Sequence, residues 1–486
     1  MAGQETRYDS YQTVIGLEIH VQLATQSKIF ATEAVSFAVA PNHQVSAITM
    51  AHPGALPFIN GDCIRLAVTM GLATNCQIRR QSYFARKNYF YPDLPKGYQL
   101  SQDDQPICYE GLVQVPMPDG SLLEVRLERI HLEEDAGKSI HDQSPEYTQI
   151  DLNRAGTGLI EMVTFPDLRS AEEAGALMAE VRRLVRYLGV SDGNMQEGSL
   201  RCDANVSVMP KGSETLGTRV EIKNINSISQ VIRAIQYESK RQVDCIEAGQ
   251  TIYQETRTWN VDRQQSQPMR HKETADDYRY FPEPDLQPVH VSESLIQELK
   301  VQQPELPYQR FLRYSGTYQF PLNEATALIE QREFSEYFEG LSQALDSPKT
   351  AANWVLGPIR SYLNEQGIDI TAFPVPIEQI QKLIQLVENG AISHSAAREQ
   401  LFPALLEHPS QDPEDLAKAM DLLMTSLGDE LAAEMTKLIE AHPKEVKRYQ
   451  AGKKQLASFF VGQLMKAFKG KANPKEVNQV VREMLA

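Results

Sequence analysis

The sequence predicts an α+β protein in which a strand-rich first part is followed by helices only. Up to about residue 290, segments with alternating apolar residues, typical of strands, are mixed with segments of helical spacing. Beyond about residue 292 only the helical spacing continues. With 42% hydrophobic and 23% charged residues the composition is that of a folded protein, and 486 residues are too many for a single core.

Two proline-rich segments predict where the domains meet. Residues 281–288 contain three prolines, which favours a linker over a regular element. Residues 408–413 contain two more prolines and are interpreted as a second linker. We therefore expect a strand-rich domain at 1–291, a helical domain at 292–411 and a tail domain at 412–486.

The first predicted strand, residues 14–23, has an apolar residue at every odd position. Because side chains alternate along a strand, Glu18, His20 and Gln22 share the opposite face. Taken alone, this pattern is more often an antiparallel strand with a solvated polar face.

The same alternation recurs at 199–208 and at 219–223. A polar loop joins these two segments and predicts that they form an antiparallel hairpin. Their polar faces carry charged side chains of both signs, among them Arg201, Asp203, Glu221 and Lys223.

Residues 127–138 add Glu133 and Glu134 shortly before a glycine, and a slip in the apolar pattern at 128–130 predicts a β-bulge. If all these strands share one sheet, its polar face gathers several carboxylates and a histidine. Such like charges repel one another unless cations lie between them. Oxygen-rich donor sets suit Mg²⁺ rather than zinc, so the face is a candidate magnesium site.

Carboxylates beside basic side chains also suit a Mg²⁺-nucleotide site, because the acids hold the metal and the bases neutralise phosphate. The sequence contains no Walker A motif, kinase glycine-rich loop or GxGxxG motif. Any nucleotide site in this chain must therefore be of a less common kind. Residues 83–98 mix aromatic and basic side chains, and burial of these rings in the core and stacking on a base are equal alternatives.

Capping and spacing predict the helices. Ser170 and Glu173 form a capping box that opens one helix, and a second helix ends at Gly249. Further helices are expected near 292–300, 323–345, 349–365, 376–390 and 393–406. In the tail, Asn473 is expected to cap a last helix that begins at Pro474.

The five cysteines are dispersed and include no CxxC pair, which indicates reduced thiols and no thiolate zinc site. The N-terminus lacks the apolar run of a secretory signal, and no segment approaches the roughly 18–20 apolar residues of a membrane span. We therefore expect a cytoplasmic protein without membrane association.

The tail is basic within an acidic chain. The net charge of the whole sequence is −16, yet residues 444–486 carry ten Lys or Arg against three acids. This asymmetry predicts that the tail, and not the body, meets a polyanion. An ordinary lysine-rich helical surface is the alternative.

Long sequence blocks carry a family resemblance. They are VIGLEIHVQL, HPGALPFIN, RKNYFYPDLPKGYQLSQ, HLEEDAGKS, DLNRAGTGLIEMVT, MQEGSLRCDANVSV, EIKNINS, DYRYFPEPDL and GQLMKAFKGKANPKEVN. They span nearly the whole chain and resemble the GatB family, one of the components of the tRNA-dependent amidotransferases. The resemblance implies a glutamine-synthetase-like cradle with an antiparallel sheet, an all-α helical domain and an all-α YqeY-like tail.

The resemblance also implies the reaction, that of a carbon–nitrogen ligase with glutamine as amide donor. ATP phosphorylates the side-chain carboxylate of misacylated Glu-tRNA(Gln) or Asp-tRNA(Asn), and ammonia then displaces the phosphate. The ammonia comes from glutamine hydrolysed on a separate glutaminase subunit (GatA), and a small third subunit (GatC) clamps the two together. ATP and Mg²⁺ are the implied cofactors.

The positions that match the family's metal-binding residues are Glu18, His20, Glu133, Glu134, Asp203 and Glu221. Which of the two adjacent glutamates is the direct ligand stays open. The expected catalytic residues are Glu18, His20, Glu133, Asp203 and Glu221. Lys87, Arg201 and Lys223 are expected to contact phosphate or carboxylate. The expected tRNA-binding residues are Lys453, Lys466, Lys469, Lys471 and Lys475.

One departure from the family pattern concerns zinc. Many relatives carry a CxC…CxxC set after the first strand, whereas the corresponding positions here are Ala31, Glu33, Ser46 and Thr49. We therefore expect no zinc, and a loop at 31–50 that is held by packing alone. Two other functions are considered: a stand-alone carboxylate–amine ligase of the glutamine-synthetase type, and a tRNA-docking scaffold with a degenerate site.

Overall fold

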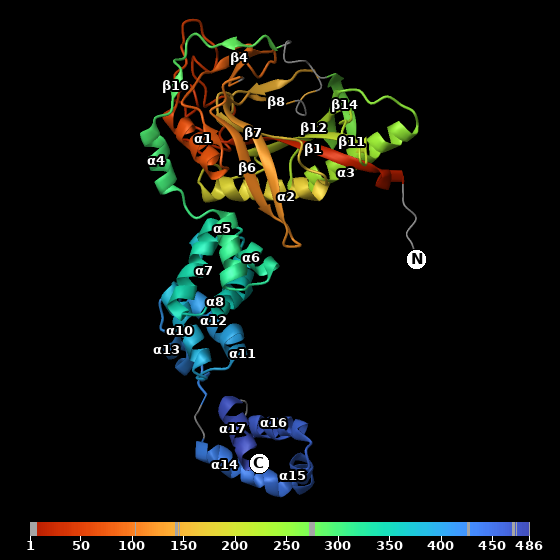
Figure 1. Ribbon diagram of the computed structural model, residues 1–486. Helices are drawn as coiled ribbons and strands as arrows, with labels where there is room; N and C mark the ends of the chain where they lie inside the picture. Colours follow the sequence, from red (N-terminus) through yellow and green to blue (C-terminus); the bar gives the residue numbers. More distant parts are fainter. Residues whose placement is uncertain are drawn as a thin grey trace. The chain divides into compact units, whose positions relative to one another are not determined.

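A computed structural model describes residues 7–102, 104–140, 144, 146–271, 278–424, 428–468, 472 and 474–485. The chain divides into two compact units, Met1–Arg332 and Glu333–Ala486. All described strands belong to the first unit, and every described regular element of the second is helical (Figure 1). The α+β prediction is confirmed. The finer division into 1–291, 292–411 and 412–486 stays a prediction.

The first unit is built on a twelve-stranded sheet. Its main path is β14 (Gln265–His271), β13 (Glu255–Asn260), β12 (Val220–Ile225), β11 (Leu200–Pro210), β1 (Tyr11–Gln22), β10 (Gly158–Thr164), β7 (Leu122–Glu134), β5 (Tyr98–Ser101), β4 (Ala85–Asn88) and β15 (Phe281–Pro282). Off this path, β6 (Cys108–Pro116) pairs with β7 and with β2 (Gln77–Ile78). Two small sheets pair β3 (Gln81–Ser82) with β16 (Val289–His290) and β8 (Lys138–Ile140) with β9 (Gln149–Asp151).

The predicted hairpin is confirmed, because β11 and β12 pair in antiparallel register. The expectation of an antiparallel sheet is wrong at one place, where β12 and β13 run parallel. A parallel neighbour requires a crossover connection, and α3 (Ile228–Glu247) lies between these two strands in the sequence. The sheet is therefore mixed.

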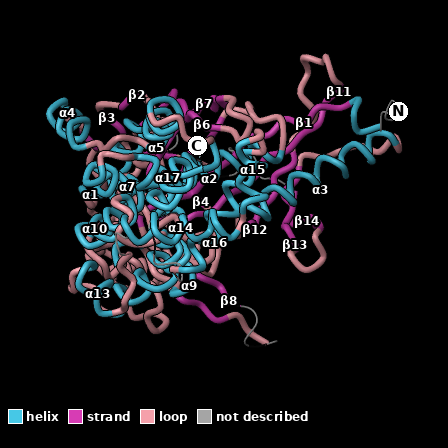
Figure 2. The backbone as a smooth tube through the Cα atoms, turned by 90° about the horizontal axis from the view of Figure 1, so that it is seen from below, coloured by secondary structure: helices cyan, strands magenta, loops and turns pink. Residues whose placement is uncertain are grey.

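One face of the sheet is apolar and packs against helices. The odd residues of β1, such as Ile15, Leu17 and Ile19, are fully buried in the main core. This core also includes residues of α1 (Gly61–Ala73), α2 (Ala171–Tyr187) and α3. Figure 2 shows α2 and α3 along this side of the strands, and α3 contacts both β11 and β12. The even residues of β1 are thereby directed to the opposite, polar face.

The predicted β-bulge lies in β7. Val163 of β10 pairs with Arg129, but the next residue, Thr164, pairs with Leu127, so Glu128 is the extra residue. The bulge changes the alternation from buried odd positions before it to buried even apolar positions after it. Glu133 consequently faces the polar side of the sheet, whereas Glu134 turns to the other side.

The helices of the first unit follow the capping signals in part. The hydroxyl of Ser170 accepts a hydrogen bond from the Glu173 amide at the start of α2, as predicted. No sequence signal was assigned to α1, whose N-cap is Asn60. The helix expected at 323–345 is two helices, because the chain turns between Leu328 and Arg332. The turn is fixed from outside, since the Tyr187 hydroxyl donates to the carbonyl of Ile329.

The remaining helices of the first unit, and α7 across its end, are α4 (Glu293–Gln302), α5 (Pro307–Leu312), α6 (Leu322–Leu328) and α7 (Arg332–Leu345). The second unit continues with α8 (Pro348–Trp354), α9 (Arg360–Gln366), α10 (Ile377–Glu388), α11 (His394–Ala396), α12 (Phe402–Glu407) and α13 (Pro413–Ala419). Its last helices are α14 (Gly428–Ala441), α15 (Pro443–Gln450), α16 (Ala457–Ala467) and α17 (Pro474–Leu485). Short π-helical turns join several of them, at η3 (Arg313–Thr317), η4 (Val355–Ile359) and η6 (Ala397–Leu401).

A separate apolar cluster holds α14 to α17 together, with Met435, Phe460 and Val481 among its buried members. The last helix begins at Pro474 as predicted, whereas its expected cap, Asn473, lies outside the described residues. Of the five lysines expected to bind tRNA, Lys453, Lys466 and Lys475 are exposed. Lys469 and Lys471 lie outside the described residues.

The loop at 31–50 is held by hydrogen bonds as well as by packing, so the expectation of packing alone is wrong. The Thr49 hydroxyl donates to the Glu33 carboxylate at 2.7 Å. The fully buried ammonium of Lys28 donates to the carbonyl of Gln44 at 2.6 Å. The Ser46 hydroxyl accepts from the Thr49 amide. Three of the four positions in question thus carry polar groups that bond within the loop, or to its neighbour.

Candidate active site

The polar face of the sheet contains a cavity of about 350 Å³. Acids and histidines from four strands form its floor: Glu18, His20, His131, Glu133, Glu161 and Glu221. Two lysines and four tyrosines form its wall: Lys87, Lys223, Tyr89, Tyr91, Tyr278 and Tyr280. So many charged groups in one cavity identify it as the candidate active site.

The strand register brings the acids of the floor together. β1 lies between β10 and β11, and the paired residues are Glu18 with Asp203 and His20 with Glu161. On the far side of β10, Glu161 is paired with His131 of β7. Residues paired in this way point to the same face with Cβ atoms about 5 Å apart.

Two groups result, and each places three ligand atoms within 4.8 Å of one another. The first, here called the histidine group, consists of His20, Glu133 and Glu161. The second, here called the carboxylate group, consists of Glu18, Asp203 and Glu221. The sequence had suggested five of these six residues, but as members of one site.

In the histidine group, Nε2 of His20 lies 3.6 Å from Glu133 and 3.4 Å from Glu161. His131 approaches Glu161 equally closely, at 3.4 Å. Burial lowers the pKa of His20, but attraction by Glu161 and then Glu133 outweighs it and raises this pKa to about 9. Burial, followed by repulsion from Glu161, raises the pKa of Glu133. Burial alone would raise the pKa of Glu161, but attraction by His20 and His131 holds it well below its usual value.

Glu161 and His131 were missed in the sequence. Glu161 lies within the apolar run of β10, where the neighbouring residues are buried. A single acid inside such a run is itself a signal, because an unpaired charge is costly to bury. His131 alternates with Glu133 along β7. Locating the bulge would therefore have shown that His131 points to the same face as Glu133.

In the carboxylate group, each acid has its own partner. The Asn205 amide donates to Glu18 at 2.9 Å, and the Thr256 hydroxyl donates to Glu221 at 2.7 Å. The ammonium of Lys223 donates to Asp203 and lies 3.3 Å from Glu221. Burial lowers the pKa of Lys223, but attraction by Asp203 and Glu221 outweighs it and raises this pKa.

Lys87 is placed in the wall of the cavity, with its ammonium 4.9 Å from the centre of the Tyr278 ring. The aromatic segment 83–98 divides between the two alternatives that the sequence left equal. Phe84 is buried in the main core, whereas Tyr89 and Tyr91 line the cavity.

Two predicted residues belong to neither group and do not line the cavity. Glu134 turns away, accepting hydrogen bonds from Lys96 and, at 2.8 Å, from the amide of Leu100. Arg201 forms an ion pair with Asp135 at 2.7 Å and is not among the cavity's lining residues. Of the Glu133–Glu134 pair, the structure therefore brings only Glu133 to the site.

Comparison with known families accounts for both parts of the chain. Residues 13–297 match the family model described as the GatB/GatE catalytic domain, and residues 336–485 match the model described as the GatB domain. The chain belongs to the GatB family. Both groups of the candidate site lie inside the first match, and the three described tail lysines lie inside the second.

Curated GatB relatives are similar over nearly their whole length. A protein of Chlorobium phaeobacteroides (strain BS1) is 48% identical, with 98% of this chain and 99% of the relative covered. A protein of Thermosynechococcus vestitus (strain NIES-2133 / IAM M-273 / BP-1) is 46% identical over 100% of this chain and 99% of its own. Both are named as the B component of an aspartyl/glutamyl-tRNA(Asn/Gln) amidotransferase. Within the described part of this GatB chain, no helix is both long and apolar enough to cross a membrane.

Proposed function

We propose that this chain is the amidating component of a tRNA-dependent amidotransferase. It uses ATP to activate the side-chain carboxylate of Glu or Asp carried on tRNA, and replaces the activated oxygen by ammonia. The observation that supports this most directly is one cavity lined by two lysines and by every member of the two acid-rich groups except Asp203. The names of the relatives agree with it.

Both groups fit divalent cations. A His with two carboxylates, or three carboxylates, is an oxygen-rich donor set of the kind that holds Mg²⁺. Burial, followed by repulsion from Glu161, raises the pKa of Glu133, and a bound cation would relieve that repulsion. The buried Oδ1 of Asn205, beside the carboxylate group, has no hydrogen-bond partner among the described residues. Bound Mg²⁺ would neutralise the phosphates of ATP.

The chain's own cations would complete the neutralisation. Lys87 and Lys223 line the cavity on the side of the two groups, where they can approach phosphate oxygens or the substrate carboxylate. No cysteine is among the lining residues of the described cavity. Activation of a carboxylate by phosphate needs charge neutralisation and alignment, not a protein nucleophile.

The remaining roles follow from the same proposal. Ammonia would come from glutamine hydrolysed on a partner glutaminase (GatA), and a small third protein (GatC) would hold the two together in the cytoplasm. The relatives are named as one component of a larger enzyme. The sheet unit would act as the cradle, and the YqeY-like tail would bind tRNA through Lys453, Lys466, Lys469, Lys471 and Lys475.

The test supplies the purified chain with ATP, Mg²⁺, ammonium chloride and either Glu-tRNA(Gln) or Asp-tRNA(Asn), with and without GatA and GatC. We expect amidated tRNA in the absence of glutamine. Turnover of free glutamate without tRNA would instead support the stand-alone ligase. Failure to amidate tRNA even with both partner proteins and ammonium would support the docking scaffold.

A further inference from the structure

Thr256 of β13 shares the cavity face with Glu221 of β12. The two residues are directly paired across the parallel strands, so their side chains point the same way. Thr256 is only 2% exposed and donates its hydroxyl to Oε2 of Glu221 at 2.7 Å. A bond to one carboxylate oxygen fixes the plane of the carboxylate, and hence the direction in which the other oxygen points.

The residues on either side of Thr256 point to the opposite face, toward α3. There Arg257 donates to Glu255 at 2.6 Å and to both the hydroxyl and the carbonyl of Ser266, at 2.7 and 3.0 Å. Ser266 belongs to β14, so these bonds fix β13 against its outer neighbour. Because side chains alternate, β13 is held in place by contacts on one face while Thr256 bonds to Glu221 on the other.

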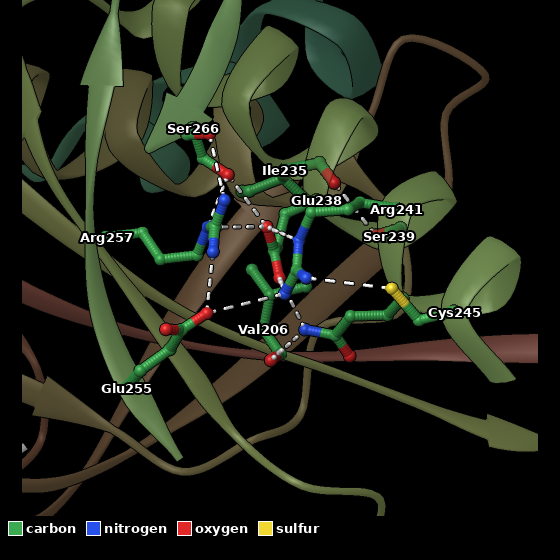
Figure 3. A network of polar contacts seen from close by, with 10 residues as sticks. Val206, Ile235, Glu238, Ser239, Arg241, Cys245, Glu255, Arg257 and Ser266 are labelled. Atoms are coloured by element: carbon green, nitrogen blue, oxygen red, sulfur yellow. Dashed lines mark hydrogen bonds and ion pairs between the residues drawn. The ribbon is translucent and has the colours of Figure 1, made fainter. Parts of the chain in front are cut away.

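Glu238 of α3 is the centre of this arrangement, and it is fully buried. Figure 3 shows its carboxylate between the guanidinium groups of Arg241 and Arg257. It accepts from Arg241 at 2.6 and 2.9 Å and from Ser266 at 3.0 Å. With Glu255, two acids face two arginines, so the charges of the network balance.

Gln242 extends the network to the inner strand. Its amide donates to Glu238 at 2.9 Å and to the carbonyl of Val206 at 3.0 Å. Val206 lies in β11, the strand that carries Asp203. The network therefore links β13 to β11 behind β12, and these three strands carry Thr256, Asp203 and Glu221.

We propose that Thr256 is a positioning residue that orients Glu221 for cation binding by the carboxylate group. The network around Glu238 keeps β13 in the position relative to β12 at which this hydrogen bond forms. The inference rests on the proposed function for the role of the cation, but it concerns how the chain prepares the site. It adds two residues to the site, Thr256 on the cavity face and Glu238 on the far face of the sheet.

The first experiment measures Mn²⁺ binding to the full chain by electron paramagnetic resonance, without ATP or tRNA. Thr256→Val removes the hydroxyl and keeps the shape, and Thr256→Ser keeps the hydroxyl. We expect the valine variant to weaken one Mn²⁺ site by about tenfold or more, the range typical of lost outer-shell hydrogen bonds. The serine variant should stay close to the wild type. Wild-type binding in the valine variant, or equal losses in both, would overturn the proposal.

The second experiment tests the network with a matched pair. Glu238→Gln is compared with Glu180→Gln, because Glu180 on α2 is an equally buried acid paired with an arginine three residues later, Arg183. Glu180 does not line the cavity. Both variants should lower the melting temperature, but only Glu238→Gln should weaken Mn²⁺ binding. Equal Mn²⁺ binding in the two would remove Glu238 from the proposal.

The outcomes separate this inference from the proposed function. Suppose that the wild-type chain binds Mn²⁺ and that Thr256→Val weakens this binding, but that the wild-type chain never amidates tRNA. This outcome would refute the proposed function alone. Chain that amidates tRNA but shows unchanged Mn²⁺ binding in Thr256→Val would refute this inference alone. If Glu238→Gln does not fold, the two Thr256 variants still decide the claim about Glu221.

Discussion

The histidine group and the carboxylate group lie on neighbouring strands of one sheet, yet they hold their charge differently. In the histidine group, two buried acids share His20 and His131. In the carboxylate group, three acids are served by one ammonium, that of Lys223, and by neutral donors from Asn205 and Thr256. The first group can balance its charge with its own protons, whereas the second retains an excess of negative charge.

This difference indicates that the two groups respond to different variables. If both groups bind a cation as proposed, proton binding competes with it at the histidine group, because His20 has a raised pKa. At the carboxylate group the competitor is the ammonium of Lys223, whose charge is permanent at neutral pH. Substitutions in each group therefore test that contrast.

Glu161→Gln should have the largest effect. It removes a charge from the histidine group while keeping the shape of the side chain, and we expect ammonium-dependent amidation of tRNA to fall by at least about a hundredfold. Glu134→Gln is the control, since Glu134 on the neighbouring strand β7 points away from the cavity. Its melting temperature should fall, but the Mg²⁺ concentration for half-maximal activity should not change. If Glu134→Gln abolished amidation and Glu161→Gln did not, the candidate site would lie on the face of the sheet that carries Glu134.

Lys223→Met should strengthen cation binding by the carboxylate group but slow the amidation of tRNA. Without its ammonium, the three acids attract a divalent cation more strongly, and we expect about tenfold tighter Mn²⁺ binding, equivalent to about 1.4 kcal/mol. Amidation should nevertheless slow, because a positive charge is lost where the proposed function places the phosphates of ATP. Lys87→Met is the comparison, as Lys87 is attracted to Glu133 and Glu161 instead. Weaker Mn²⁺ binding in Lys223→Met would show that Lys223 supports the group and does not compete.

His20 gives the histidine group a pH dependence that can be measured without metal. Its folded-state pKa of about 9 exceeds the ordinary value of 6.5, so the folded chain binds this proton more tightly than the unfolded chain. The resulting stability is fully present below pH 6.5 and is lost as pH rises through 9. Urea unfolding in a chelator should show this decline in the wild type. The decline should shrink in His20→Gln, and an unchanged slope would assign it to other groups.

Lys28 should give a smaller change of opposite sign, outside the cavity. Burial lowers its pKa from 10.5 to about 8, so between these values the unfolded chain binds the extra proton and stability rises with pH. The difference in unfolding free energy between the wild type and Lys28→Met should therefore grow in favour of the wild type from pH 8 to 10.5. A flat difference would mean that the ammonium stays charged inside the loop.

Much of the site could be predicted from alternation alone. The polar face of β1 gave Glu18 and His20, and the hairpin gave Asp203 and Glu221. Their division into two groups required the register, because Glu18 pairs with Asp203 while His20 pairs with Glu161 two residues further along. No local pattern in the sequence specifies which residues stand opposite one another on strands more than a hundred positions apart.

The misses have physical causes of the same kind. Arg201 alternates with Asp203 and was expected at the site, but Asp135 draws it into an ion pair. The broken helix between Leu328 and Arg332 has no breaker residue, and depends on the hydroxyl of Tyr187 in α2. In both places a partner distant in the sequence decides the outcome over local preference.

The bulge at Glu128 in β7 decides to which face of the sheet the later residues of the strand point. If β7 took Glu128 into regular alternation instead of a bulge, every later position of the strand would change face, so that Glu134 would take the cavity face and Glu133 the core. The chain would keep each amino acid of its acidic pair, in the same order, while exchanging what each one does. The bulge is thus as much a part of the candidate site as its side chains, because it decides which of two adjacent acids faces the cavity.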